Sequence, residues 1–544
     1  MRKDEEVTAN TRISGPTRAA WGGFRELDRR QTALLFGVLI ATAIVYLPSL
    51  RDGFVFDDHG EIIQNRRIGD WSFLWISLVR NLWWFRPGGA PQSAYYRPLQ
   101  NVWFGLAFHL MGRGSGGWHA AKIAMHLVAV LLSFRLAQVL SESFAVALIT
   151  ALLFGLHPVH AEAVVWISSI PEVLVAIFEF ATLIVFIGRH SHPSARVLSI
   201  ALFSLALLSH ETAIVFPLVL MAYVAIFEHS GATAASAHQR AIASAREVVR
   251  QVWPFFIPIC FLFLVRAVVL HGRFLGKTPG RLVVGLVNRK MVVEHVSTKL
   301  SVPQVIATAP SALLGYLKLM ALPWVDGPVY PILFVRRPNF LNVGLPVTVL
   351  LGLVIAVIVL ARRSSHWRLY LFTAVWAVTA LIVPLASLNQ ILVTPVQDRY
   401  AYAATFGLCL AFGVATGSET ESSWRRVSAI AVGLLALTYA FCLWRLQPIW
   451  TDDSTLFGEC AREFPDSAFY RRAYGDVLAR EGDLGGELRE LEAAEKLDPA
   501  DYHTHVQLSN LYGRLGRDAD SKRELHEAYR LFAPWSVGES SDSR

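Results

Sequence analysis

Long apolar runs alternate with short polar segments over the first 445 residues, and this alternation is the strongest pattern in the chain. A run of about 20 apolar residues matches the thickness of a bilayer. The run at 195–228 is too long for one crossing and is interrupted at Ser209-His210-Glu211, so it predicts two spans. The apolar runs cover residues 31–50, 118–140, 144–164, 166–188, 195–228, 252–271, 303–323, 340–361, 367–388, 399–417 and 427–445.

The distribution of Arg and Lys next to these runs predicts their orientation, because cytoplasmic loops carry the excess of positive charge. All the basic segments can be cytoplasmic at once only if 303–323, which is interrupted by Pro303 and Pro310, does not cross. The sequence therefore predicts eleven spans and an outer C-terminus. The basic segments are the polar tail 1–30, the loop of Arg189 and Arg196, residues 240–250, residues 362–368, and Arg425-Arg426.

This topology predicts an all-α, polytopic membrane bundle over residues 31–445, with two long outer loops at 51–117 and 272–339. It also collects four polar stretches on the outer side, at 51–117, 157–165, 209–212 and 389–399. Apolar spans alone give no reason for ionisable residues to gather on one side. The clustering indicates a site at the outer face.

After Arg445 the composition becomes that of a soluble helical domain, with a repeat of 34 positions. This period is typical of tetratricopeptide (TPR) repeats, in which small residues lie where two helices cross. We expect a helix near 453–463, TPR repeats within 446–534 and a disordered tail at 535–544; an ordinary helical hairpin is the alternative. The matched pairs are Gly482 and Gly516, Gly475 and Ser509, Leu491 and Leu525, Ala494 and Ala528, and Pro465 and Pro499.

Composition agrees with a membrane protein: of 544 residues, 54% are hydrophobic and 17% charged. A globular domain has about 25% charged residues. The net charge of +8 is spread among the apolar runs, which argues against a nucleic-acid partner. The four cysteines show no CxxC spacing, so we expect neither a disulfide framework nor a zinc site from them.

The stretch FVFDDHGEIIQN, residues 54–65, which we call the acidic loop, follows the first apolar run. Adjacent acids at a bilayer surface are costly to desolvate unless they face water or have a function. Asp57 and Asp58 are therefore candidate catalytic residues, because a positioned carboxylate can act as general base on a hydroxyl nucleophile. A solvated turn or a helix cap explains the pair equally well.

A second polar stretch, FGLHPVHAEAVVW, places His157, His160 and Glu162 within six positions. Such residues can bind a divalent cation. However, Pro158 breaks the helix, so hydrogen-bonded structural histidines are at least as good an interpretation. In either case Glu162 is a candidate partner for a ligand hydroxyl. The metal question stays open, and no organic cofactor is expected.

The remaining candidates for substrate binding are His210 and Glu211, Arg97 in YYRPLQN, and Asp398 and Arg399 in QDRYAY. A guanidinium fork suits phosphate oxygens. His210-Glu211 is either a functional pair or a polar turn between two spans. The outer loop 272–339 adds further cations that either grip a lipid phosphate or rest on anionic headgroups; these are Arg273, Lys277, Arg281, Arg289, Lys290, Arg336 and Arg337.

In order along the chain, FVFDDHGEIIQN, YYRPLQNVWFGLAFHLMG, LLFGLHPVHAEAVVWIS, SHETAIVFPLVL, LPWVDGPVYP and DRYAY resemble the TMTC proteins and their bacterial relatives. These are transmembrane, TPR-containing O-mannosyltransferases, similar to the GT-C class of glycosyltransferases. The resemblance runs from about residue 35 to the end of the repeats. His210-Glu211 stands where many relatives have Lys-Glu.

The resemblance implies a transferase that moves a mannose-like sugar from a polyprenyl- or dolichyl-phosphate donor to Ser or Thr of a translocated polypeptide, on the non-cytoplasmic face. It implies that Asp57 or Asp58 is the carboxylate of the first outer loop that acts as catalytic base or metal-site residue, that HPVH-E and DRY line the same cleft, and that the TPR repeats bind a protein partner. A lipid or glycan acceptor, a transporter and a non-catalytic scaffold are the alternatives. The abundance of Arg and Ala favours a bacterial inner membrane with an outer TPR domain.

Overall fold

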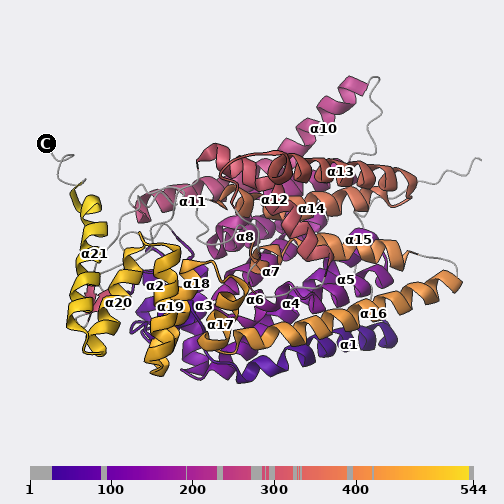
Figure 1. The fold of residues 1–544 in the computed structure, drawn as a ribbon. Helices are drawn as coiled ribbons and strands as arrows, with labels where there is room; N and C mark the ends of the chain where they lie inside the picture. The colour runs from indigo at the N-terminus through magenta and orange to yellow at the C-terminus, as the bar shows by residue number, and fades with distance from the viewer. Residues whose placement is uncertain are drawn as a thin grey trace, which may run out of the picture.

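The computed structural model describes residues 27–537 except 87–94, 191–192, 229–236, 271–284, 288–289, 293–300, 323–327, 329, 331–333, 389–395 and 419–421. Within these residues the chain is an all-α polytopic bundle, as predicted, followed by a separate group of helices at its C-terminal end (Figure 1). A two-stranded antiparallel ribbon, β1 (Gly285–Val287) and β2 (Lys290–Val292), pairs Leu286 with Met291.

In the part of the chain that the structure describes, eight helical segments are long and apolar enough to cross a membrane, which indicates a multi-pass membrane protein. They and three shorter apolar helices coincide with the eleven expected spans; the number that cross stays a prediction. The run at 303–323 forms a further helix, α12. The bundle helices are α1 (Arg29–Tyr46), α4 (Ser115–Ser141), α5 (Phe144–Leu156), α7 (Ile170–Ile187), α8 (Pro193–Ser209), α9 (Phe216–Tyr223), α10 (Ala237–Val252), α11 (Phe256–Val269), α12 (Val302–Ala321), α13 (Leu345–Arg363), α14 (Trp367–Ala386), α15 (Thr405–Gly417) and α16 (Ser422–Leu446).

Burial separates the centre of the bundle from its rim. In the span that contains α7, 72% of the residues are buried inside the protein, whereas in the span that contains α13 the share is 6%. An apolar helix whose side chains find no protein neighbours has to bury them in lipid. We therefore place α7 at the centre and α13 at the lipid-facing perimeter.

Two helices of 13 residues, α5 and α15, pack closely beside α4. Their contact depends on glycine: a Cβ on Gly413 would lie 2.9 Å from the Val146 carbonyl oxygen, and one on Gly417 would lie 2.9 Å from the Val146 nitrogen. Contacts this short are not tolerated, so only glycine permits the approach. These two helices lead directly to the polar stretches that follow His157 and precede Thr405.

The polar stretches carry three short helices, α2 (Ser72–Ser77), α3 (Pro98–Met111) and α6 (His160–Val165). The chain leaves α5 at Leu156 and resumes a helix at His160, so Pro158 breaks the helix as predicted. Trp71, which directly precedes α2, and Trp75, which lies within it, are exposed. Exposed tryptophans next to apolar spans are typical of the bilayer interface.

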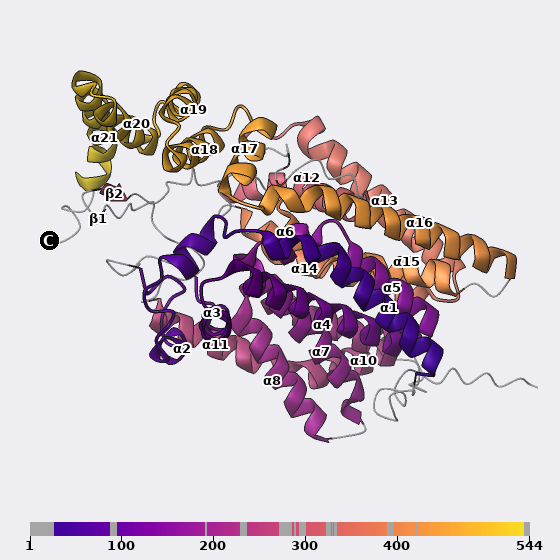
Figure 2. The same ribbon diagram turned by 90° about the horizontal axis from the view of Figure 1, so that it is seen from below.

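Beyond α16, five helices project from one end of the bundle (Figure 2). Helix α17 (Asp453–Glu463) matches the helix expected near 453–463, and its N-cap Asp452 forms a capping box with Thr455. Two hairpins follow, α18 (Ala468–Glu481) with α19 (Leu484–Leu497), and α20 (Tyr502–Arg514) with α21 (Asp518–Val537). Corresponding helices begin 34 positions apart; the assignment to the TPR class stays a prediction.

Glycine closes both hairpins, since Gly482 and Gly516 have φ of +86° and +70°. A left-handed residue after the last helical turn ends a helix, and glycine adopts it without strain.

Some of the sequence-based predictions concern residues that the structure does not describe. These residues comprise most of the tail 1–30, Arg273, Lys277, Arg281 and Arg289, residues 389–395 of the last polar stretch, and the tail after 537; the side chain of Lys290 is likewise not described.

Candidate active site

The four polar stretches predicted to lie on one side meet at one end of the bundle. Asp58 of the first stretch contacts Ser168 near the second, and Glu162 of the second pairs with Arg399 of the fourth. Arg97 of the first stretch pairs with Glu211 of the third. Residues 57 and 398 therefore lie at the same end, as the sequence predicts.

Asp58 is fully buried and organises the acidic loop. One carboxylate oxygen accepts hydrogen bonds from the Ser168 N–H at 2.8 Å and from the Ser168 hydroxyl, and the other accepts from the Val55 N–H at 3.1 Å. Burial raises the pKa of Asp58 to about 7, against the opposing effect of the bonds from Ser168 and Val55. A fully buried carboxylate that accepts hydrogen bonds on both oxygens holds the loop in place.

Asp57 is only partly buried, so of the two acids it is the one that a substrate hydroxyl can reach. Its neighbour Glu61 is buried and accepts from Gln100 Nε2 at 3.1 and 3.0 Å. Burial raises the pKa of Glu61 well above its ordinary value, and the charge on Asp57 adds to the shift. Burial and the repulsion from Asp57 thus both favour the protonated form of Glu61.

The two histidines of the second stretch hold the bundle together rather than converging on one point. His157 donates from Nε2 to the Met320 carbonyl at 3.0 Å, and its Nδ1 accepts from the Val159 N–H. His160 donates from Nε2 to the Thr405 hydroxyl at 2.8 Å. These contacts correspond to the interpretation as hydrogen-bonded structural histidines.

Glu162 clamps the start of the DRY segment. One of its oxygens accepts from the Arg399 backbone N–H at 2.9 Å, and the other pairs with the Arg399 guanidinium. The Arg399 Nε lies 3.9 Å from Glu172 of α7, so two acids neutralise this arginine. Asp398, beside it, is buried and accepts from the Tyr330 hydroxyl at 2.5 Å.

A second arginine–glutamate pair lies at the same end. Arg97 donates from Nε and Nη2 to the two oxygens of Glu211, at 3.0 and 2.8 Å. Bidentate pairing fixes the guanidinium plane and uses one edge of it. His210 connects the two pairs, because its Nε2 lies 3.7 Å from Glu172. Both arginines expected to bind phosphate are thus pre-positioned by carboxylates.

Four residues that the sequence analysis did not single out belong to this site. They are Glu61, Lys122, Ser168 and Glu172. The fully buried Lys122 donates from Nζ to the Ala163 carbonyl at 2.6 Å, which ties α4 to the HPVH-E stretch. An ionisable residue within an apolar span is a functional candidate by default, so the sequence alone could have identified Lys122 and Glu172. Ser168 carried no such signal.

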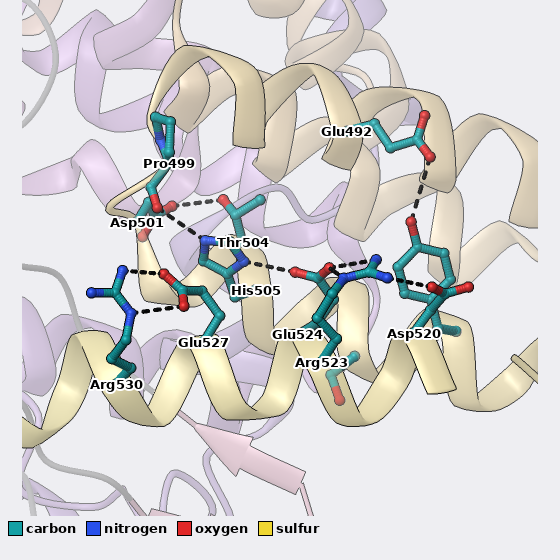
Figure 3. Close-up of polar contacts among 12 residues, drawn as sticks. Glu492, Pro499, Asp501, Thr504, His505, Asp520, Arg523, Glu524, Glu527 and Arg530 are labelled. Carbon is teal, nitrogen blue, oxygen red and sulfur yellow. Dashed lines mark hydrogen bonds and ion pairs between the residues drawn. The ribbon is translucent and has the colours of Figure 1, made fainter. Parts of the chain in front are cut away.

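Among the described residues, one group of three side chains is arranged so that it could hold a metal ion, and it lies in the C-terminal hairpins: Glu495, His505 and Glu524. Figure 3 shows His505 between the Pro499 carbonyl, at 3.0 Å from Nε2, and Glu524, at 2.8 Å from Nδ1. Arg523 also pairs with Glu524 at 3.0 Å. A protonated His505 and Arg523 balance the two carboxylates, so the group is complete as an ion-pair network.

Comparison with known proteins gives distant relatives of one kind. The chain is 31% identical to protein O-mannosyl-transferase F38B6.6 of Caenorhabditis elegans over 186 residues, 34% of this chain and 27% of the relative. It is 24% identical to Tmtc3 of Drosophila melanogaster, covering 93% of this chain and 60% of the relative, and 22% identical to human TMTC3, covering 93% and 55%.

The chain is thus a distant homologue of proteins named protein O-mannosyl-transferases, and it spans little more than half the length of the relatives that it matches along most of its length. No protein-family model matches the chain, and no solved structure matches it.

Proposed function

We propose that the protein is an integral-membrane glycosyltransferase of the GT-C type, which moves a mannose-like sugar from a polyprenyl-phosphate donor to Ser or Thr hydroxyls of an exported polypeptide. The observation that carries the proposal is the position of Asp57, a partly exposed acid at the end of the bundle where two arginines are held in fixed orientations. The names of the distant relatives support it.

In this mechanism Asp57 accepts the proton of the acceptor hydroxyl as that oxygen attacks the anomeric carbon of the sugar. The bond from the anomeric carbon to the phosphate oxygen breaks, and the lipid phosphate leaves with the electron pair. Arg97 and Arg399 stabilise the charge that develops on the phosphate, which is the role of pre-positioned donors in a site of low dielectric constant. Asp58, Glu61 and Ser168 keep the acidic loop in place.

The proposed site lies on the non-cytoplasmic face of an inner membrane, where the C-terminal hairpins receive the translocated polypeptide. The distribution of Arg and Lys supports this placement, and so do the contacts of Asp453 with Phe56 of the acidic loop and with Arg480 of the first hairpin.

The experiment is mass spectrometry of exported proteins from cells that carry the wild-type chain, the Asp57→Asn variant or no copy. We expect a hexose on Ser or Thr that disappears in the last two. A hexose that appears on a lipid or glycan and not on protein would instead identify the alternative acceptor. Sugar transfer that persists in the Asp57→Asn variant would contradict the proposed base.

A further inference from the structure

The chain that joins the bundle to the repeat hairpins folds back against the acidic loop. The Gly53 N–H donates to the Thr451 carbonyl at 2.8 Å, and a Cβ on Gly53 would come within 3.3 Å of the same oxygen. Trp450 stacks on Trp166 with ring centroids 5.8 Å apart. The C-terminal region is therefore seated on the candidate site and not merely tethered to it.

Phe56, directly before Asp57, has an unusual backbone conformation. Its φ is +50°, a region that an aromatic residue rarely adopts because its Cβ meets the following carbonyl oxygen. Such a conformation persists only where the surroundings impose it, and it is often found at functional sites. The Phe56 ring lies 5.7 Å from the rings of both Trp166 and Phe457.

One side chain contacts the acidic loop on both sides of Asp57. Asp453, at the start of α17, accepts from the Phe56 N–H at 2.8 Å across 397 positions of sequence. Its other oxygen lies 3.1 Å from His59 Nε2 and 2.8 Å from Arg480 Nη1 of α18. Thus Asp453 connects the residue before Asp57, the residue after Asp58 and the first repeat hairpin.

The electrostatics agree with a charged Asp453. Burial alone raises the pKa of this carboxyl, but the hydrogen bonds from His59 and Phe56 and the nearby Arg480 outweigh burial and lower it. The pKa of His59 is raised chiefly by its bond to Asp453. An ionised carboxylate that accepts from a backbone N–H makes a stronger bond than a neutral acceptor.

We propose that Asp453 is a positioning residue for Asp57, so that the C-terminal domain supplies part of the framework of the active site. The inference rests on the proposed role of Asp57 as the base. Without Asp453, Phe56 relaxes to a negative φ, and the carboxylate of Asp57 moves away from the acceptor hydroxyl. A partner that shifts α17 or α18 changes the geometry of the site through the same contact.

The test uses full-length protein in lipid nanodiscs and two independent measurements. Hydrogen exchange followed by mass spectrometry reports on the backbone of residues 54–65, and transfer from a polyprenyl-phosphate-hexose to a Ser/Thr peptide gives kcat and KM. The variants are Asp453→Ala and Asp453→Asn. Asp452→Asn is the matched control, because it changes the adjacent acid but keeps a side chain that caps α17.

We expect Asp453→Ala to speed exchange in residues 54–65 by about tenfold to a hundredfold, the factor associated with losing a hydrogen bond to a charged acceptor. We expect kcat to fall by a similar factor with the KM for the lipid donor unchanged. Asp453→Asn keeps an acceptor for the Phe56 N–H but loses its charge, so its effect should be intermediate. Asp452→Asn should leave both measurements unchanged.

The outcomes separate the inference from the proposed function. If hydrogen exchange in residues 54–65 is unchanged in folded Asp453→Ala or Asp453→Asn protein, Asp453 does not hold the acidic loop in place and the inference is wrong. Faster exchange with unchanged kcat would overturn the positioning role. If the wild-type protein transfers no sugar while exchange in residues 54–65 is still faster in the Asp453 variants, the proposed function is wrong, but Asp453 does hold the acidic loop in place. If Asp453→Ala does not fold, Asp453→Asn supplies the same comparison.

Discussion

The two adjacent acids of the acidic loop should respond differently to the same substitution: replacing Asp57 should lower activity alone, whereas replacing Asp58 should lower both stability and activity. In the Asp57→Asn variant the altered side chain is partly exposed, so the free energy of unfolding should change less than in the Asp58→Asn variant. Sugar transfer should fall by about 10²- to 10⁴-fold, the usual contribution of a general base.

The Asp58→Asn variant should show the reverse emphasis. In the wild-type protein the Val55 N–H donates to the second carboxylate oxygen of Asp58 at 3.1 Å. An asparagine that keeps its oxygen toward Ser168 places its NH₂ group against this N–H instead. A buried donor then faces a donor, which costs about 1–3 kcal/mol of unfolding free energy. Transfer should fall as well, because the loop that carries Asp57 loosens.

The assay compares unfolding midpoints in detergent with single-turnover transfer for both variants. Asp70→Asn is the control, because it changes an exposed acid between the same two helices and should affect neither measurement. A destabilised Asp57→Asn protein beside an unaffected Asp58→Asn protein would refute the assignment of base and structural acid. An active Asp57→Asn protein would refute the base itself.

Three further predictions concern the supporting structure. Glu162→Gln breaks the pair with Arg399 and should cost about 3 kcal/mol, read from the unfolding midpoint; no change would show that the pair is solvated. Gly482→Ala introduces a Cβ at φ +86° and should destabilise by about 1–2 kcal/mol, whereas Gly485→Ala within α19 should be neutral or stabilising; equal effects would contradict the left-handed cap. Burial lowers the pKa of His505, but the hydrogen bond to Glu524 outweighs burial and raises it. The stabilising contribution of this hydrogen bond is therefore complete below about pH 6.5 and is lost as the pH rises through the pKa of His505 in the folded protein. The stability gap between wild type and His505→Gln should therefore narrow from pH 6 to pH 8, and a constant gap would contradict a protonated His505.

The sequence predicted the features that depend on local pattern. Apolar runs, the break at Pro158 and the interval between Gly482 and Gly516 each reflect constraints within a few residues of themselves. The meeting of the polar stretches at one end also followed, because the charge rule fixes the side of each loop without any knowledge of packing.

Features that depend on distant contacts were not predicted. Asp58 differs from Asp57 because it accepts hydrogen bonds from Ser168, 110 positions away. The Asp-Asp dipeptide itself does not show which acid is buried and which is partly exposed. Asp453 lies in a soluble-looking helix, where its spacing marks it only as a first-turn acid. Arg97 and Arg399 were expected to be available for phosphate, and their acidic partners became evident only once helices far apart in sequence were placed side by side.

The short lengths of α5 and α15 bear on the depth of the candidate site in the bilayer. Thirteen residues of helix extend about 20 Å, and the hydrocarbon slab is about 30 Å thick. If both helices start at the far surface, Glu162 and Arg399, which follow and precede their other ends, lie some 10 Å beneath the near headgroups. Under the proposed function, a lipid-linked sugar reaches this depth from within the leaflet, and the acceptor is the substrate that has to descend.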